Sequence, residues 1–164
     1  MDNKKKKDIY WDFQPAFYFE VEFKEMKRNG KKIAEKEKVA FKEVSGLNRE
    51  METETVREGG LNNQEYKLPK SIKHGNLIMK KALIPGNSGL VRNLKSTFEG
   101  YFTQPFIKQD ILIYLLNPEG EAMHSWMCSD AHPVKWEVSS FDSEKNELVI
   151  EHVEFAYTTL VKRK

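Results

Sequence analysis

Two histidines and a cysteine at even spacing are the side chains in this sequence that most invite metal chemistry. His124, Cys128 and His132 follow one another at intervals of four residues, and zinc accepts histidine nitrogen and cysteine thiolate as ligands. Even spacing places all three on one face of a strand. A strand rises ~3.3 Å per residue, however, so neighbours in this series lie about 13 Å apart. Pro133 opposes the helix that would stack them. We therefore expect no metal site.

Two further histidines are the remaining candidates for catalysis. His74 has no acid or nucleophile close to it in the sequence, whereas His152 follows Glu151 and precedes Glu154 by two residues. In a strand Glu151 and His152 face opposite sides, so a carboxylate partner for acid–base work is unsupported. The chain has no glycine-rich phosphate loop and no serine in a nucleophile-elbow motif. These patterns predict a protein that is not an enzyme and has no cofactor.

The composition is that of a globular domain with a richly charged surface. Of 164 residues, 39% are hydrophobic, 12% aromatic and 32% charged, and the net charge is +2. This length suits one domain, and the aromatic content argues against disorder. The run Lys4–Lys7 marks a basic N-terminal arm over residues 1–14, a feature that is commonly a solvated tail. Residues 15–164 are expected to form the domain.

Cysteine count and hydropathy bear on where the chain is made. A single cysteine, Cys128, excludes a disulfide within the chain and fits a reducing cytosol. The sequence shows no secretory signal and no apolar run of about 18 residues. We therefore expect a cytoplasmic protein, made without a signal peptide or membrane anchor. Its balanced charge does not indicate a specific nucleic-acid partner.

Alternating and apolar runs predict the elements that must position all these side chains. Residues 16–23 alternate cleanly, and Asn29-Gly30 is typical of a tight hairpin turn that leads into a charged return strand, expected to run to Val44. Further strands are predicted at 49–56, 76–84, 110–116, 121–129, 134–139 and 147–160. The near-continuous apolar run 110–116 is expected to be buried on both faces. A helix capped by Asn87 or Ser88 is predicted over residues 89–100, with an apolar stripe formed by Leu90, Leu94 and Phe98. The predicted fold is mainly β: an antiparallel barrel or sandwich of about seven or eight strands with one packed helix.

Residues 57–75 interrupt this regularity. They contain Gly59-Gly60, Pro69 and several lysines among glutamates, with little periodicity, so we expect a long loop without regular structure. Such loops inside a compact domain are usually functional. Mixed charge suits a protein–protein contact better than a nucleic-acid groove, which would be more uniformly basic. A merely solvated loop is the alternative.

Seven short segments form an ordered series along the chain. In order they are Phe41–Leu47 (FKEVSGL), Thr55–Gly60 (TVREGG), Lys67–Lys70 (KLPK), Lys73–Lys81 (KHGNLIMKK), Asp110–Asn117 (DILIYLLN), Ala131–Lys135 (AHPVK) and Val149–Tyr157 (VIEHVEFAY). This series resembles the tail-tube family, which comprises the inner-tube proteins of contractile phage tails and phage-tail-like contractile injection systems. The resemblance runs from about residue 15 to residue 160. The chain departs from the family pattern at the long charged connection 24–38, at a helix with Phe98 rather than tryptophan, and at Lys70 in place of glycine.

The resemblance implies a structural protein that works by self-assembly. A homo-hexameric ring would stack into a rigid hollow tube inside a contractile sheath, with a fold similar to that of the type VI secretion tube protein. Expected partners are the sheath protein, baseplate hub and spike proteins, a tube cap, and effector or cargo in the lumen. Residues 57–75 would then reach a neighbouring subunit or ring, and charge reversal at Arg57 or Glu58 should abolish tube assembly. The expected contact residues are Arg57, Glu58, Gly59, Gly60, Lys70, Lys73 and His74.

Two other interpretations remain open. The chain is alternatively a baseplate tube-initiator ring protein of the same machine, or a small β-barrel that binds a ligand or nucleic acid. Long filaments would favour the tube, isolated rings the initiator, and a monomer stabilised by ligand the third. The sequence assigns no lumen-lining residues and does not distinguish a phage tail from an extracellular particle or a cell-anchored secretion system.

Overall fold

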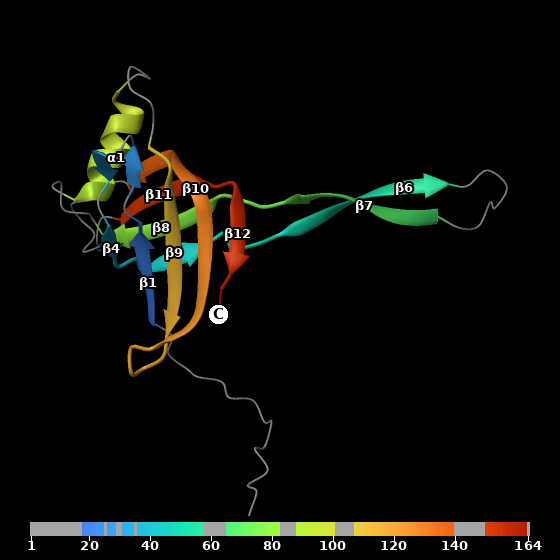
Figure 1. Ribbon diagram of the computed structural model, residues 1–164, viewed down its shortest axis with the longest axis horizontal. Helices are drawn as coiled ribbons and strands as arrows, with labels where there is room; N and C mark the ends of the chain where they lie inside the picture. Colours follow the sequence, from blue (N-terminus) through green and yellow to red (C-terminus); the bar gives the residue numbers. More distant parts are fainter. Residues whose placement is uncertain are drawn as a thin grey trace, which may run out of the picture.

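The computed structural model describes residues 18–24, 26–28, 31–34, 36–57, 65–82, 88–100, 107–139 and 150–163. These residues form twelve strands and one helix (Figure 1). The predicted class, mainly β with antiparallel pairing and a single helix, is confirmed for them. The strands are β1 (Tyr18–Phe23), β2 (Met26–Arg28), β3 (Lys31–Ala34), β4 (Glu37–Val39), β5 (Glu43–Ser45), β6 (Glu50–Arg57), β7 (Glu65–Lys73), β8 (Leu77–Ala82), β9 (Gln109–Leu116), β10 (Ala122–Val138), β11 (Ile150–Ala156) and β12 (Thr159–Lys162), and the helix is α1 (Gly89–Phe98).

An eight-stranded sheet forms the body of the molecule. Seven strands follow the order β4-β1-β9-β10-β11-β8-β5, and β12 pairs with β10 as well. The first half of β10 lies between β9 and β12, whereas its second half pairs with β11. One long strand is therefore shared by two parts of the sheet, where the sequence predicted two separate strands.

A bend near Asp130 lets β10 serve both parts. The register with β9 shifts between Cys128 and Ala131, and Asp130 has a φ of 53°. The backbone N–H of Asp130 donates to the carboxylate of Asp110, 3.2 Å away. Aspartate tolerates this left-handed conformation better than most residues, and a bulge bends the strand that carries it. The sheet turns a corner here and encloses the core.

The core fills the space that this curved sheet encloses. Val21 and Phe23 of β1 are 0% and 2% exposed, which confirms the burial expected from their alternation. The ring of Phe23 meets that of Phe155 on β11, with centroids 5.8 Å apart. β9 is buried on both faces in its first half, as predicted, because Leu112 points away from the core yet is only 5% exposed. Large side chains from distant strands thus hold the two parts of the sheet together.

Helix α1 packs beside this body through one apolar face. Ser88, one of the two predicted caps, accepts a hydrogen bond from the N–H of Val91. Leu90 and Leu94 of the predicted stripe are buried. Phe98 is 39% exposed, and its ring meets that of Trp136 in a tilted arrangement. The stripe fails at its third position because Phe98 is the last residue of the helix.

Strands β6 and β7 form a hairpin that projects away from the body, and we call residues 50–57 and 65–73 the projecting hairpin (Figure 1). The two strands pair only with each other among the described residues. The expectation of a loop without structure over 57–75 is therefore wrong for 65–73, which is strand β7. Every residue of β7 is exposed, so this strand lacks the buried face that sequence patterns detect. β2 and β3 pair as the predicted charged hairpin, but β4 returns to β1 instead of prolonging it.

Candidate assembly surface

Of the predicted contact residues, those that the structure describes lie on or next to the projecting hairpin. Arg57 ends β6, with its side chain outside the described part of the structure, and Glu58, Gly59 and Gly60 lie outside it altogether. Lys70 is exposed, and because Glu52 pairs with Ser71 while Thr53 pairs with Pro69, it is the extra residue of a bulge. A bulge adds local twist to the strand that carries it. Lys70 therefore marks a change in the course of the hairpin as well as a charge.

Apolar side chains are exposed along the projecting hairpin, and sequence reasoning missed them as a surface. Met51 on β6 lies opposite Ile72 on β7, and Val56 lies opposite Tyr66. An isolated two-stranded hairpin is marginally stable in water, and contiguous exposed apolar residues mark interaction surfaces. The exposed fractions are 57% for Met51, 39% for Val56, 46% for Tyr66, 51% for Leu68 and 62% for Ile72.

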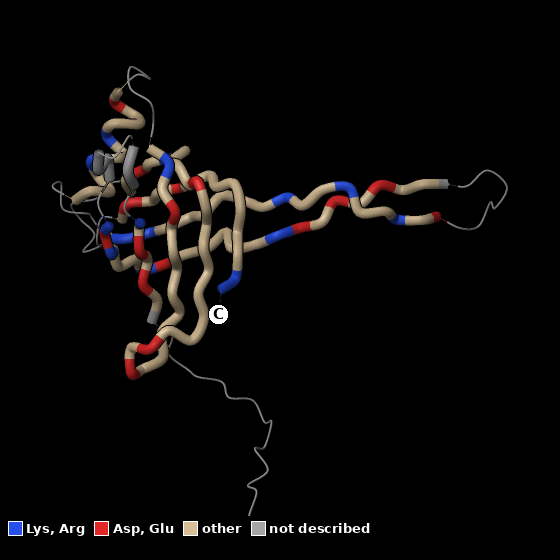
Figure 2. Tube along the Cα trace, viewed as in Figure 1, with Lys and Arg blue, Asp and Glu red and all other residues tan. Residues whose placement is uncertain are grey.

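Charged residues of both signs share this hairpin (Figure 2). The carboxylate of Glu52 on β6 pairs with the ammonium of Lys73 on β7 and accepts a hydrogen bond of 2.8 Å from Ser71. These contacts, that of Lys73 first, lower the pKa of Glu52. Lys73, predicted as a contact residue, is thus partly engaged within its own hairpin. Exposed pairs of this kind contribute little to stability.

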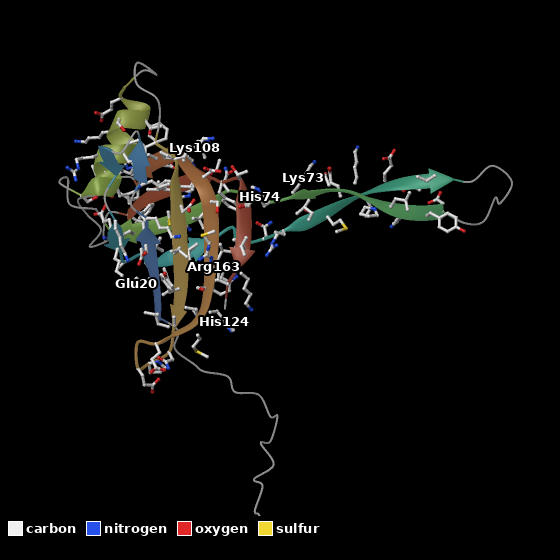
Figure 3. The ribbon with its side chains drawn as sticks, in the orientation of Figure 1. Glu20, Lys73, His74, Lys108, His124 and Arg163 are labelled. Carbon is white, nitrogen blue, oxygen red and sulfur yellow. The ribbon has the colours of Figure 1, made fainter. Side chains whose placement is uncertain are left out.

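The root of the projecting hairpin is a compact group of residues from three separate segments. Its members are Gly46 and Asn48 before β6, His74 and Gly75 after β7, and Tyr157 after β11. Figure 3 shows His74 between the sheet and the hairpin, next to Lys73. His74 is half-buried and its ring stacks on that of Tyr157, with centroids 4.2 Å apart and planes at 13°. The structure thus places His74 against its own chain.

Tyr157 also contacts the other connection to the hairpin. Its hydroxyl donates to the carbonyl oxygen of Gly46 across 3.1 Å. Gly46 has a φ of +88°, and a Cβ there would collide with the carbonyl oxygen of Asn76. Only glycine fits such a position without strain. The three segments FKEVSGL, KHGNLIMKK and VIEHVEFAY thus meet at one point.

His124, Cys128 and His132 all lie in β10, as expected for a strand, and they form no metal site. Cys128 is fully buried, and burial raises the pKa of its thiol to about 12. The thiol therefore stays protonated at neutral pH, whereas a metal ligand or a nucleophile needs the thiolate. Among the described residues no three His, Cys, Asp or Glu side chains could hold a metal ion.

His152 lies in a row of surface charges on the outer face of the sheet. Its Nε2 is 3.6 Å from Glu154 and its Nδ1 3.7 Å from Glu137. Glu151 points to the opposite side and is 4% exposed, as the strand alternation predicted. Lys135 pairs with Glu137 at 2.7 Å, which raises the pKa of Lys135 and lowers that of Glu137. Paired surface charges of this kind supply neither a nucleophile nor a poised acid.

Among the residues that the structure describes, no helix has the length and the apolar character of a membrane-spanning segment.

A family model described as "T4-like virus tail tube protein gp19" matches residues 15–161. That family is one of structural tube proteins, in agreement with the prediction that the chain is not an enzyme. No curated protein matches the sequence significantly.

Several solved structures share the fold. One is a chain in the cryo-EM structure of the anti-feeding prophage (AFP) baseplate, with 27% identity, a TM-score of 0.77 and coverage of 90% of this chain and 93% of that one. A second is in the PVC extracellular contractile injection system, in its sheath/tube terminator in the extended state; the values are 25% identity, TM-score 0.73, and coverage of 92% and 96%. Hcp1 from Flavobacterium johnsoniae is 13% identical, with a TM-score of 0.53 and coverage of 88% and 94%, a likeness of fold alone.

Proposed function

The chain belongs to the T4-like virus tail tube protein gp19 family, and from that premise we propose that it is the structural subunit of the inner tube of a contractile injection system. Hexameric rings of the chain stack into a rigid hollow conduit for effector or cargo delivery. The sheath protein surrounds this tube, and baseplate hub and spike proteins and a cap close its ends. The similar chains in AFP and PVC contractile assemblies support this reading.

The projecting hairpin is the observation that carries the proposal. It exposes five large apolar side chains and has no strand partner in the rest of the described chain. Burying such side chains at a subunit interface is favourable by about 25 cal/mol per Å² of apolar surface. A second copy of the chain is the occupant, because a ring with stacking neighbours offers the same surface at every position. The proposed contact residues are Arg57, Glu58, Gly59, Gly60, Lys70, Lys73 and His74.

Open sheet edges are consistent with ring formation. Among the described residues, β4 pairs only with β1, β5 only with β8 and β12 only with β10. Edge strands present unpaired backbone groups that invite pairing with another chain. Neighbouring subunits in a ring would cover such edges and continue the sheet around the lumen.

Removing the projecting hairpin tests the proposal directly. Glu50 and Lys73 face each other in register, so residues 51–72 can be replaced by an Asn-Gly turn that keeps the pair. We expect this variant to remain a folded monomer by circular dichroism and light scattering, whereas the full chain forms tubes in electron micrographs. A matched control replaces Val134 and Val138, which are 41% and 37% exposed on β10, by serine; it should still assemble. Normal tubes from the hairpin-less variant would overturn the proposal.

A baseplate tube-initiator ring is the second candidate, favoured by the similarity to a chain in the AFP baseplate structure. Micrographs of the purified protein separate the two, because an initiator stops at isolated rings and a tube subunit continues into filaments. A monomer stabilised by a small ligand or by nucleic acid would instead support a binding barrel.

A further inference from the structure

We infer that Tyr157 and His74 form an intrachain latch that sets the direction of the projecting hairpin before any neighbour is met. The inference rests on the proposed function for its consequence in assembly, but its geometry belongs to the single chain. His74 accordingly acts by positioning the hairpin.

The latch is needed because little else ties the hairpin to the body. β6 and β7 pair with each other alone among the described strands. Only the connections 46–49 and 74–76 join them to the sheet, and each contains a glycine, Gly46 and Gly75. Glycine permits more backbone conformations than any other residue. Without side-chain contacts the two connections would act as a hinge.

Tyr157 contacts both connections at once. Its ring stacks on His74, and its hydroxyl donates to the carbonyl oxygen of Gly46. The Nε2 of His74 lies 3.2 Å from the carbonyl oxygen of Thr158, the residue after Tyr157. A fourth contact closes the group, because the N–H of Gly75 donates to the Oδ1 of Asn48 at 3.4 Å. The two strands of the hairpin are therefore fixed to each other and to the segment between β11 and β12.

The length of the hairpin makes this fixation consequential. β7 has nine residues, so the hairpin reaches about 30 Å from its root. A rotation of about 10° at the root would move the far end by about 5 Å, more than a hydrogen bond or a packed interface tolerates. Losing one aromatic stack changes the ratio of correctly directed to misdirected hairpins by about tenfold. A small contact at the root thus decides whether all the hairpins of a ring can dock together.

Single-molecule energy transfer measures the latch without assembly. Dyes are attached to cysteines introduced at Thr55 on β6 and Glu119 in the turn after β9, since the buried Cys128 does not react, and the chain is refolded at picomolar concentration. We expect one narrow distribution of dye-to-dye distances for the labelled chain with Tyr157 and His74 in place. The distribution should be broad or shifted for Tyr157→Ala and His74→Ala. His74→Phe keeps the stack and loses only the contact of Nε2 with Thr158, so its distribution should stay close to the narrow one. Tyr157→Phe keeps the ring and should broaden it only slightly.

A separate control removes the effect of stability alone. Phe155→Leu weakens the core close to Tyr157 but leaves the root contacts in place, so its distribution should stay narrow. In micrographs, His74→Ala should reduce tube yield about tenfold and His74→Phe should restore it. Unchanged distances in Tyr157→Ala and His74→Ala would overturn the latch whatever happens to the tubes. If the unmodified chain forms no tubes, the proposed function fails, and the distance measurements still decide the latch.

Discussion

The carbonyl oxygen of Asn76 occupies the space that a side chain at Gly46 would need. Gly46 has a φ of +88°, and Asn76 is the last residue of the connection 74–76 that follows the projecting hairpin. The two connections of the hairpin therefore pass each other at a distance that only a glycine allows. This explains in physical terms why a glycine stands in the FKEVSGL segment.

Gly46→Ala should destabilise the monomer by about 3 kcal/mol, through the strained φ and the overlap with Asn76 together. Gly120→Ala is the matched control, because Gly120 has a similar φ of +82° but nothing within 4 Å of the added Cβ. It should cost only about 1 kcal/mol. Urea unfolding of both variants checks the difference, and equal costs would show that close approach at Gly46 does not matter.

The start of helix α1 is stabilised by two side chains. Ser88 Oγ accepts from the N–H of Val91, and the carboxylate of Glu37 on β4 accepts from the N–H of Leu90 at 2.8 Å. Ser88→Ala should lower the free energy of unfolding by about 1 kcal/mol, whereas Ser88→Gly should lower it by only a few tenths. Thermal and urea unfolding of the two variants provide the test, and an equal loss in both would argue against capping.

Much of the body of the fold could be predicted from sequence because its strands have a buried face. The alternation around Val21 and Phe23 and the apolar run of β9 both report burial against a core. The sequence predicts two strands, 121–129 and 134–139, where the structure has the single strand β10. The structure keeps the strand continuous by bending it at Asp130, a solution that depends on the distant Asp110.

The projecting hairpin and its root could not be predicted in the same way. β7 is exposed throughout, and Pro69 with the bulge at Lys70 obscures its alternation. The root depends on contacts between residues far apart in the sequence, such as His74 with Tyr157. Motif order indicated that these segments belong to one family, but spacing along the chain carries no information on which of them meet.

Cys128 should make the protein sensitive to alkaline pH. Burial raises the pKa of its thiol from 9.0 to about 12, so the unfolded chain releases this proton at lower pH than the folded chain. The stabilisation that comes from the buried, protonated thiol is complete below pH 9 and is lost as pH rises toward 12. Between pH 9 and 11 the free energy of unfolding falls by about 2 kcal/mol for this reason. Urea unfolding at several pH values should show a shallower decline for Cys128→Ala. Parallel declines in both proteins would contradict this assignment.

Lys70 allows the backbone of the projecting hairpin to be changed separately from its charge. Deleting Lys70 removes the bulge and leaves the pairs Glu52–Ser71 and Thr53–Pro69 adjacent in a regular ladder. We expect the monomer to unfold at an unchanged urea concentration, since every residue of β7 is exposed. Tube assembly should nevertheless fail, because losing the bulge reduces the local twist and redirects the part of the hairpin beyond it.

Lys70→Ala keeps the bulge and removes only the charge, so it should assemble, with a weaker response to salt. Electron micrographs at two salt concentrations compare the variants. If the deletion assembles while Lys70→Ala does not, the charge of Lys70 governs docking and the bulge does not.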